Sequence, residues 1–189
     1  MGPMFSGKST ELIRQARRYR TIYKDRILMV NHSLNKRYGS TCVTTHDKGE
    51  WNENCVSVFS LADVHNLEVW RKASVIMIEE LQFFHDAFDY VQHWVEECDK
   101  IVIAAGLDGD YKREPFGDVL KLVPYADKIQ KLSAICCYCG DGTPACFTHR
   151  KQQRTNTTRV VVGAKATYTS VCRKHYRELN DDSALYINK

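Results

Sequence analysis

The sequence has 189 residues, of which 43% are hydrophobic and 26% are charged, and its formal net charge is +4. This length suits one α/β core with a small appendage and excludes two ordinary domains. No apolar run approaches the roughly 18 residues that a membrane span needs, so we expect no membrane partner. Because no leader segment begins the sequence, we expect a cytoplasmic protein whose eight cysteines serve another purpose than disulfides.

A phosphate-binding motif begins the chain. Residues 2–9, with the sequence GPMFSGKS, match the pattern G-x-x-x-x-G-K-[ST] without a mismatch. The glycines let backbone N–H groups surround an anion, Lys8 adds positive charge on the outer phosphates, and Ser9 holds Mg²⁺. The alternative is an accidental glycine turn. Since the motif normally follows a buried strand, we expect the natural chain to carry a strand before Gly2, unless that strand is missing altogether.

The segments that follow alternate between helical and strand-like patterns. Residues 9–23 and 84–98 have the length and apolar spacing of helices. Residues 27–30, 75–78 and 101–105 are short continuous apolar runs, which are typical of strands covered on both faces of a parallel sheet. This alternation predicts an α/β fold with a parallel sheet.

Two acidic residues follow the strand predicted at residues 75–78. In enzymes with a phosphate loop, an acid at the end of a neighbouring strand holds the metal, and a base activates the attacking group. Glu79 and Glu80 are in this position, and neighbouring side chains on an extended segment point in opposite directions. One carboxylate can therefore face the metal and the other the acceptor hydroxyl. The alternative is a solvated acidic turn.

The composition changes near residue 128, where a strand-like stretch to residue 134 precedes a group of cysteines. We predict a nucleotide-binding core over residues 1–132 and a small module over residues 133–189 that ends in a polar tail.

Two ligand pairs in this module predict a metal site. Cys136 and Cys139 form a C-x-x-C pair, and Cys172 and His175 form a C-x-x-H pair. Two such pairs supply tetrahedral ligands for Zn²⁺, and four protein ligands make the site structural. The alternative is a set of free buried thiols.

Together these motifs resemble the type II thymidine kinases, the cellular and poxviral family, from Gly2 to Tyr176. The resemblance rests on the segments GPMFSGKSTELIR (2–14), KRY (36–38), THD (45–47), QFF (82–84), GLDGDYKREPFG (106–117) and SVCRKHY (170–176). It implies a RecA-like core and a zinc-ribbon module with a long lasso loop that closes over the nucleoside. It also implies a homotetramer or a dimer.

The resemblance further implies roles for individual residues. Glu80 is similar to the family's general base on the 5′-hydroxyl, with Lys8 and Arg37 as further catalytic residues that act on the phosphates. The residues expected to bind ATP and Mg²⁺ are Gly2, Met4, Phe5, Ser6, Gly7, Lys8, Ser9, Thr10, Glu79 and Gln82. The residues expected to bind thymidine are Met4, Leu107, Tyr111, Phe116, Thr148, Val161, Gly163 and Tyr168.

Three departures from the family pattern stand out. Glu79 and Leu81 stand where the family has Asp and Gly, so the metal-side carboxylate is one methylene longer. Asn35 replaces a common acid before the KRY segment. His175 replaces the fourth cysteine of the animal members, a change that zinc tolerates.

The predicted reaction is transfer of the γ-phosphoryl group of ATP to the 5′-hydroxyl of thymidine. The resemblance alone implies feedback inhibition by thymidine triphosphate. Two alternatives stay open: an NTPase that remodels nucleic acid through the zinc module, and a noncatalytic zinc-bearing nucleotide sensor. Against the first, no aromatic and basic tract is long enough to follow a nucleic-acid strand, so we expect no nucleic-acid partner.

Overall fold

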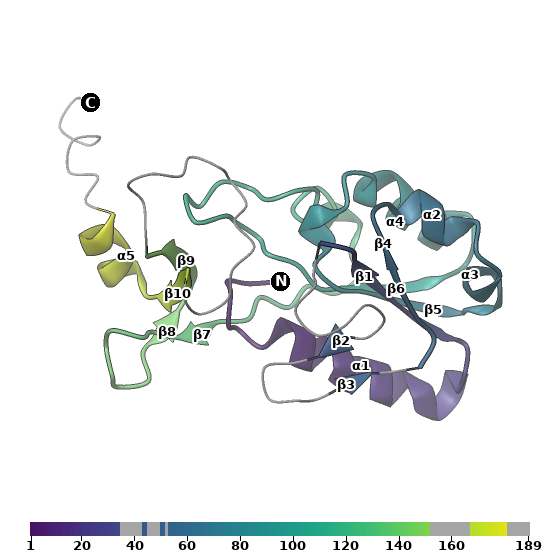
Figure 1. Cartoon of the computed structure of the whole chain (residues 1–189), viewed down its shortest axis with the longest axis horizontal. Coiled ribbons are helices and arrows are strands. Elements are labelled where there is room, and N and C mark those ends of the chain that lie inside the picture. The colour runs from purple at the N-terminus through teal and green to yellow at the C-terminus, as the bar shows by residue number, and fades with distance from the viewer. Residues whose placement is uncertain (35–42, 45–49, 52, 152–166, 181–189) are drawn as a thin grey trace. The chain divides into compact units, whose positions relative to one another are not determined.

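The computed structural model describes residues 1–34, 43–44, 50–51, 53–151 and 167–180 (Figure 1). The chain forms two compact units, and each is described by itself. Unit 1 comprises Met1 and residues 8–108 and 115–130, whereas unit 2 comprises residues 2–7, 109–114 and 131–189. The boundary between residues 132 and 133 stays a prediction.

A four-stranded parallel sheet forms the centre of unit 1. Its strands are β1 (Ile27–His32), β4 (Cys55–Val58), β5 (Val75–Ile78) and β6 (Ile101–Ala104), in the order β4-β1-β5-β6. Every residue of β1 and β5 is buried, which explains why residues 27–30 of β1 and all of β5 are continuous apolar runs and not alternating ones. The predicted α/β class with a parallel sheet is confirmed.

Helices cover both faces of this sheet (Figure 1). The remaining elements of unit 1 are α1 (Lys8–Tyr23), α2 (Leu61–His65), α3 (Glu68–Lys72), α4 (Ala87–Glu96), the 3₁₀ helices η1 (Leu81–Phe83) and η2 (Val123–Tyr125), and the antiparallel pair β2 (Val43–Thr44) and β3 (Glu50–Trp51). Within the described parts of the chain, no helix combines the length and the apolar character needed to cross a lipid bilayer.

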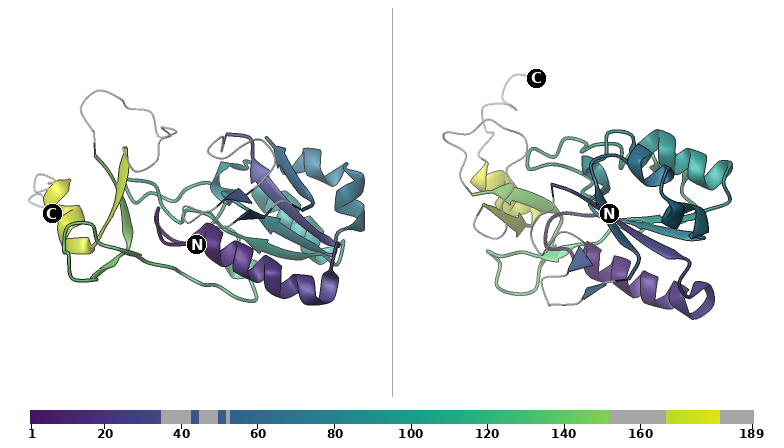
Figure 2. Two further views of the ribbon diagram at one scale, coloured as in Figure 1. Left: turned by 60° about the horizontal axis from the view of Figure 1, so that its bottom comes forward. Right: turned by 45° about the vertical axis from the view of Figure 1, so that its right-hand side comes forward.

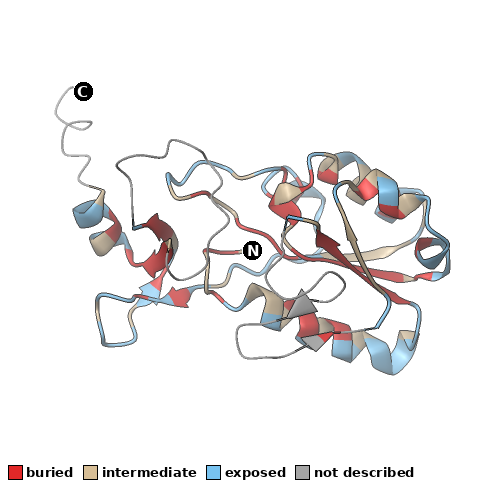
Figure 3. Cartoon of the chain, viewed as in Figure 1, coloured by how far each residue is buried: buried red, intermediate tan, exposed pale blue. Residues whose placement is uncertain are grey.

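The alternation of side chains along β1 divides the core of unit 1 into two layers. Leu28 and Val30 pack in one cluster with buried residues of α2, α3 and α4. Ile27 and Met29 point to the opposite face and pack in a second cluster with buried residues of α1. Figure 3 shows this pattern as buried stretches along the strands and on the inner sides of the helices.

Unit 2 is built from short elements. Its elements are β7 (Ala134–Ile135), β8 (Pro144–Ala145), β9 (Phe147–Arg150), β10 (Tyr168–Val171) and α5 (Arg173–Leu179). β7 pairs antiparallel with β8, and β9 pairs antiparallel with β10 beside α5 (Figure 2). The buried hydrophobic cluster of this unit is small and consists of Ala134, Cys136, Ala145, Val171, Cys172 and Tyr176.

Most predicted elements of unit 1 are confirmed within a few residues. The helix predicted at 9–23 is α1. The helix predicted at 84–98 is α4, which begins later, at Ala87, because η1 and its cap occupy the chain up to Phe84. The prediction of a strand-like stretch at residues 128–134 is wrong except for Ala134, which begins β7. Residues 128–131 are exposed and, among the described residues, have no partner strand, so their apolar alternation has no sheet to join.

Candidate functional site

The phosphate loop turns sharply before it enters α1. Phe5 and Gly7 have positive φ angles of 64° and 79°, and Gly2 has a φ of 151°. A side chain at Gly2 would collide with the carbonyl oxygen of Leu132, so this first glycine is required by close backbone packing within unit 2. The loop is also tied to β9 because the Met4 N–H donates a hydrogen bond of 3.0 Å to Thr148 Oγ1.

The first turn of α1 supplies the other half of the motif. Lys8, Ser9 and Thr10 are the first three residues of this helix, where backbone N–H groups have no partner within the helix. This end of a 16-residue helix therefore carries partial positive charge, to which the Lys8 ammonium adds a full charge.

A buried carboxylate faces this turn from the end of β5. The Ser9 hydroxyl donates a short hydrogen bond to Glu79 Oε1. Glu79 is only 3% exposed, and its backbone N–H donates to the Val30 carbonyl at 2.9 Å, so the sheet fixes its position. A hydroxyl and a carboxylate oxygen side by side are the donor types that a hard cation such as Mg²⁺ prefers, so these two residues fit that ion.

The next residue directs its side chain to different partners. Glu80 has φ 55° and ψ 43°, a left-handed conformation that separates its direction from that of Glu79. Glu80 Oε2 accepts a hydrogen bond of 2.6 Å from Gln82 Nε2. Gln82 Oε1 in turn accepts the N–H of Leu107 at 2.9 Å. The buried Gln82 amide thus connects the Glu80 carboxylate to the backbone after β6.

Close packing holds Gln82 in place. Gly117 has a φ of 58°, and a side chain there would collide with the backbone of Gln82. A Cβ at Gly106 would lie 2.9 Å from Val119 and 3.1 Å from Gln82 Oε1. Both glycines belong to the segment GLDGDYKREPFG, and their lack of a side chain lets the chain pass close to the Gln82 amide.

The residues predicted to bind thymidine are divided between the two units. Leu107 and Phe116 belong to unit 1, where the Phe116 ring packs edge-on against Phe83 at 5.6 Å between centroids. The members of the set in unit 2 are Met4, Tyr111, Thr148 and Tyr168. Arg37, Val161 and Gly163 lie outside the described residues.

Sequence reasoning missed three residues that organise the Tyr111 segment of unit 2. Tyr176 donates its hydroxyl to the Tyr111 carbonyl at 2.8 Å. Asp110 Oδ1 accepts backbone N–H groups two and four residues later, at 2.8 and 3.0 Å. The buried Arg150 places its guanidinium 5.3 Å from the centre of the Tyr111 ring. Only Asp110 has a local signal, since Asp commonly binds the backbone two residues ahead in turns.

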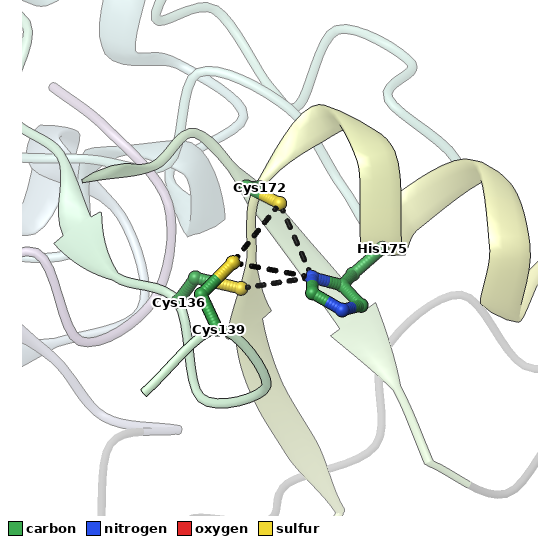
Figure 4. Close-up of side chains that lie close together, drawn as sticks. All are labelled: Cys136, Cys139, Cys172 and His175. Carbon is green, nitrogen blue, oxygen red and sulfur yellow. Dashed lines mark hydrogen bonds between the residues drawn. The ribbon is translucent and has the colours of Figure 1, made fainter. Parts of the chain in front are cut away.

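The four predicted metal ligands come together in unit 2 (Figure 4). Cys136 and Cys139 come from the turn after β7, Cys172 follows β10, and His175 lies in the first turn of α5. His175 Nδ1 lies 3.5, 3.4 and 3.3 Å from the sulfur atoms of Cys136, Cys139 and Cys172. The sulfur atoms of Cys139 and Cys172 are 3.8 Å apart.

These distances fit a tetrahedral zinc ion. Bonds of about 2.3 Å to sulfur and about 2.0 Å to nitrogen imply S···S edges of about 3.8 Å and S···N edges of about 3.5 Å in a tetrahedron. The observed sulfur to sulfur distance of 3.8 Å and sulfur to nitrogen distances of 3.3–3.5 Å have these lengths. The cluster could therefore hold a metal ion, since all four ligand atoms lie within 4.8 Å of one another.

The pKa values of the cysteines in this cluster are shifted in both directions. Burial opposes ionisation of the Cys136 thiol, but backbone hydrogen bonds from Cys172, Tyr138 and Cys139 lower its pKa to about 6. A backbone hydrogen bond from His175 lowers the pKa of Cys172, whereas burial raises the pKa of Cys139 to about 11. A bound cation would offset the cost of ionising Cys139, since metal ions bind the thiolate form.

Comparisons with known proteins agree with these sites. A family model described as thymidine kinase matches residues 1–176. The chain is 43% identical over 176 residues to the thymidine kinase of monkeypox virus, covering 93% of each protein. It is 41% identical over 177 residues to thymidine kinase a of Arabidopsis thaliana, covering 93% of this chain and 72% of the plant protein.

A second plant relative is longer than this chain. The chain is 39% identical over 179 residues to the thymidine kinase of Oryza sativa subsp. japonica, and this match spans 93% of the chain but only 64% of the rice protein. The residues matched by the family model include the phosphate loop, the acidic pair and the metal cluster. The chain belongs to the thymidine kinase family.

Proposed function

We propose that the protein transfers the γ-phosphoryl group of ATP to the 5′-hydroxyl of thymidine, giving ADP and thymidine monophosphate. Membership of the thymidine kinase family supports the acceptor. The observation that carries the proposal is the contact between Ser9 and Glu79, which joins the start of the phosphate-loop helix to the strand end that also bears Glu80.

The residues at the start of α1 hold the triphosphate in this proposal. Backbone N–H groups of the loop and the helix surround the phosphates, and Lys8 neutralises charge on the outer ones. Ser9 and Glu79 would hold Mg²⁺, which stabilises the charge that develops on the phosphate oxygens. Arg37 adds a further positive charge to the transferred group, and Met4, Phe5, Ser6 and Thr10 complete the nucleotide contacts.

Glu80 acts as the general base. Its carboxylate accepts the proton of the thymidine 5′-hydroxyl as that oxygen forms its bond to the γ-phosphorus and the bond to the ADP oxygen breaks. The Gln82 amide holds one oxygen of this carboxylate, which restricts its direction. A fixed base saves the reorientation that a mobile surface carboxylate would need.

The metal cluster has a structural role in this proposal, and its ion is zinc. Three sulfur atoms and one imidazole nitrogen already supply four ligands, which leaves no position for water or substrate. The cluster connects the turn after β7 to the start of α5 and thereby organises the unit that contains Thr148 and Tyr168.

Further properties follow from the family resemblance alone and remain predictions. They are assembly as a homotetramer or dimer, inhibition by thymidine triphosphate, and thymidine binding by Met4, Leu107, Tyr111, Phe116, Thr148, Val161, Gly163 and Tyr168. The cytoplasmic location expected from the sequence also remains a prediction.

The test is transfer of labelled phosphate from ATP to each of the four deoxynucleosides by the zinc-loaded protein, with and without single-stranded DNA. We expect thymidine to be phosphorylated fastest and DNA to have no effect. ATP hydrolysis that DNA stimulates without any nucleoside would instead support a nucleic-acid remodelling NTPase. Tight ATP binding without transfer to any nucleoside would support a nucleotide sensor.

A further inference from the structure

Three neighbouring strands of unit 1 end around one imidazole ring. His32 is the last residue of β1 and is only 4% exposed. Its ring contacts Phe59, which follows β4, and Phe83 and Phe84, which follow β5. The centroid distances are 5.9, 5.6 and 4.7 Å, and the Phe59 and Phe84 contacts are edge-on.

Hydrogen bonds fix the orientation of this ring. His32 Nδ1 accepts the backbone N–H of Leu34 at 3.2 Å, so this nitrogen carries no proton. The ring also has a hydrogen bond with the backbone of Phe59. Burial lowers the pKa of His32, and the titratable groups that act on it are His85, Asp86 and Glu80. A neutral ring therefore stays in one orientation between the strand ends.

Two of the phenyl rings that His32 contacts, those of Phe83 and Phe84, belong to the turn that presents the proposed base. Phe83 donates its N–H to the Glu80 carbonyl at 3.0 Å, and Phe84 donates to the Leu81 carbonyl at 3.1 Å. Gln82, which holds the Glu80 carboxylate, lies within the same turn. Phe83 also packs edge-on against Phe116, a residue predicted to bind thymidine. A shift of the two phenyl rings would thus move Glu80 and Gln82 together.

We propose that His32 is a positioning residue for phosphoryl transfer, whose ring holds Phe83 and Phe84 so that η1 keeps Glu80 and Gln82 in their active orientation. This inference rests on the function proposed above. His32 itself touches neither phosphate nor nucleoside in this account. Its removal should therefore lower kcat far more than it weakens ATP binding, because most of the residues expected to hold the phosphates belong to α1 and the loop before it, and only Gln82 of that set lies in η1.

The experiment compares His32→Leu with His32→Phe, which restores an aromatic ring, in the zinc-loaded full chain. His65→Leu is the matched control, since His65 also packs among aromatic rings and also accepts a hydrogen bond at Nδ1, from Trp94 at 3.0 Å. The measurements are kcat normalised to ATP-binding sites, KM for ATP, and hydrogen exchange of the amides of residues 81–84. Dividing the rate by the number of ATP-binding sites excludes misfolded molecules from the value of kcat.

We expect His32→Leu to lower kcat by about 10-fold or more, to change KM for ATP by less than about 3-fold, and to accelerate exchange in residues 81–84. His32→Phe should stay within about 3-fold of the wild-type kcat, and His65→Leu should change neither quantity. Normal kcat in His32→Leu, or an equal loss in His32→Phe or His65→Leu, would overturn the proposal. If wild type transfers no phosphate, the proposed function fails. Hydrogen exchange then tests the positioning role separately, and that role is rejected if His32→Leu leaves the exchange of residues 81–84 unchanged.

Discussion

The two units of this chain are stabilised in different ways. Unit 1 has two hydrophobic layers on either side of a parallel sheet, and large side chains such as Trp94 and Phe84 are completely buried in it. Among the described residues of unit 2, six buried hydrophobic ones form a cluster, and two of these, Cys136 and Cys172, belong to the candidate metal cluster. The described part of unit 2 thus buries fewer large apolar side chains than unit 1, and we expect its stability to depend on a bound metal ion.

This difference separates two tasks within the proposed kinase. The sheet of unit 1 fixes Glu79 at its edge, with Glu80 as the next residue, and small displacements there would disturb the roles proposed for both carboxylates. The short strands of unit 2 are organised around a cluster that holds the turn after β7 and the start of α5. Changes that are confined to one unit therefore test this division.

Removal of the metal should have the largest effect. A chelator, or Cys136→Ser, should unfold unit 2 while the sheet of unit 1 persists, because structural zinc sites supply on the order of 10 kcal/mol of folding free energy. Hydrogen exchange should show lost protection in β9 and β10 and retained protection in β1 and β5. Cys146→Ser is the control, since Cys146 is exposed and lies outside the cluster. Equal loss of protection in both units would contradict the division.

A cavity in unit 1 should have the next largest effect. Trp94→Ala removes a fully buried side chain that also donates to His65, and we expect it to lower the free energy of unfolding of unit 1 by about 3–5 kcal/mol. Urea denaturation followed by exchange in β5 measures this change. The zinc content should stay at its wild-type value, and loss of zinc would show that the metal cluster depends on the core of unit 1.

A single hydrogen bond in unit 2 provides a smaller perturbation. Tyr176→Phe removes the hydroxyl that donates to the Tyr111 carbonyl and should destabilise unit 2 by about 1 kcal/mol. The phenyl ring keeps its packing against Phe147, so the metal cluster should remain intact. Urea denaturation of the zinc-loaded protein measures the change, and a loss of several kcal/mol would mean that this bond supports more than the Tyr111 segment.

The smallest expected effect is on how the stability of the protein depends on pH. Burial lowers the pKa of His32 from its ordinary value of 6.5, so the folded protein binds this proton less readily than the unfolded chain does. His32 therefore contributes its full stability above about pH 6.5, and this contribution falls as the pH drops towards the folded-state pKa. Urea denaturation between pH 7 and 5 should show a weaker pH dependence for His32→Phe than for wild type. An unchanged slope would contradict a buried neutral His32.

The fold and the ligand sets follow from local sequence patterns to different degrees. The apolar runs of β1, β5 and β6 predict the sheet, most clearly for β1 and β5, which are buried along their whole length. Pair spacing alone predicts the candidate metal ligands Cys136, Cys139, Cys172 and His175. The short strands of unit 2 have no such signature. The tertiary contacts of the metal cluster and of Tyr176 stabilise them, and local propensity contributes little.

The partners of the site residues were beyond prediction for a similar reason. The Gln82 amide connects Glu80 to the Leu107 backbone. Gln82 and Leu107 are 25 residues apart in the sequence, and no local pattern encodes such a contact. His32 stands in an apolar strand with nothing in its neighbouring sequence to mark it, and its aromatic contacts arise only when β4 and β5 flank β1. Residue types predict which groups carry chemistry, and only the fold reveals what holds them in place.

The most direct measurement compares ATP-dependent phosphorylation of thymidine by wild type, Glu80→Gln and Glu96→Gln. Glu96 is an exposed carboxylate at the end of α4 and serves as the control. If Glu80 is the base, Glu80→Gln should bind ATP normally but lose transfer by a factor on the order of 10² or more, while Glu96→Gln keeps the wild-type rate. Near wild-type transfer by Glu80→Gln would contradict the assignment of the base, and no transfer to thymidine by wild type would contradict the kinase activity itself.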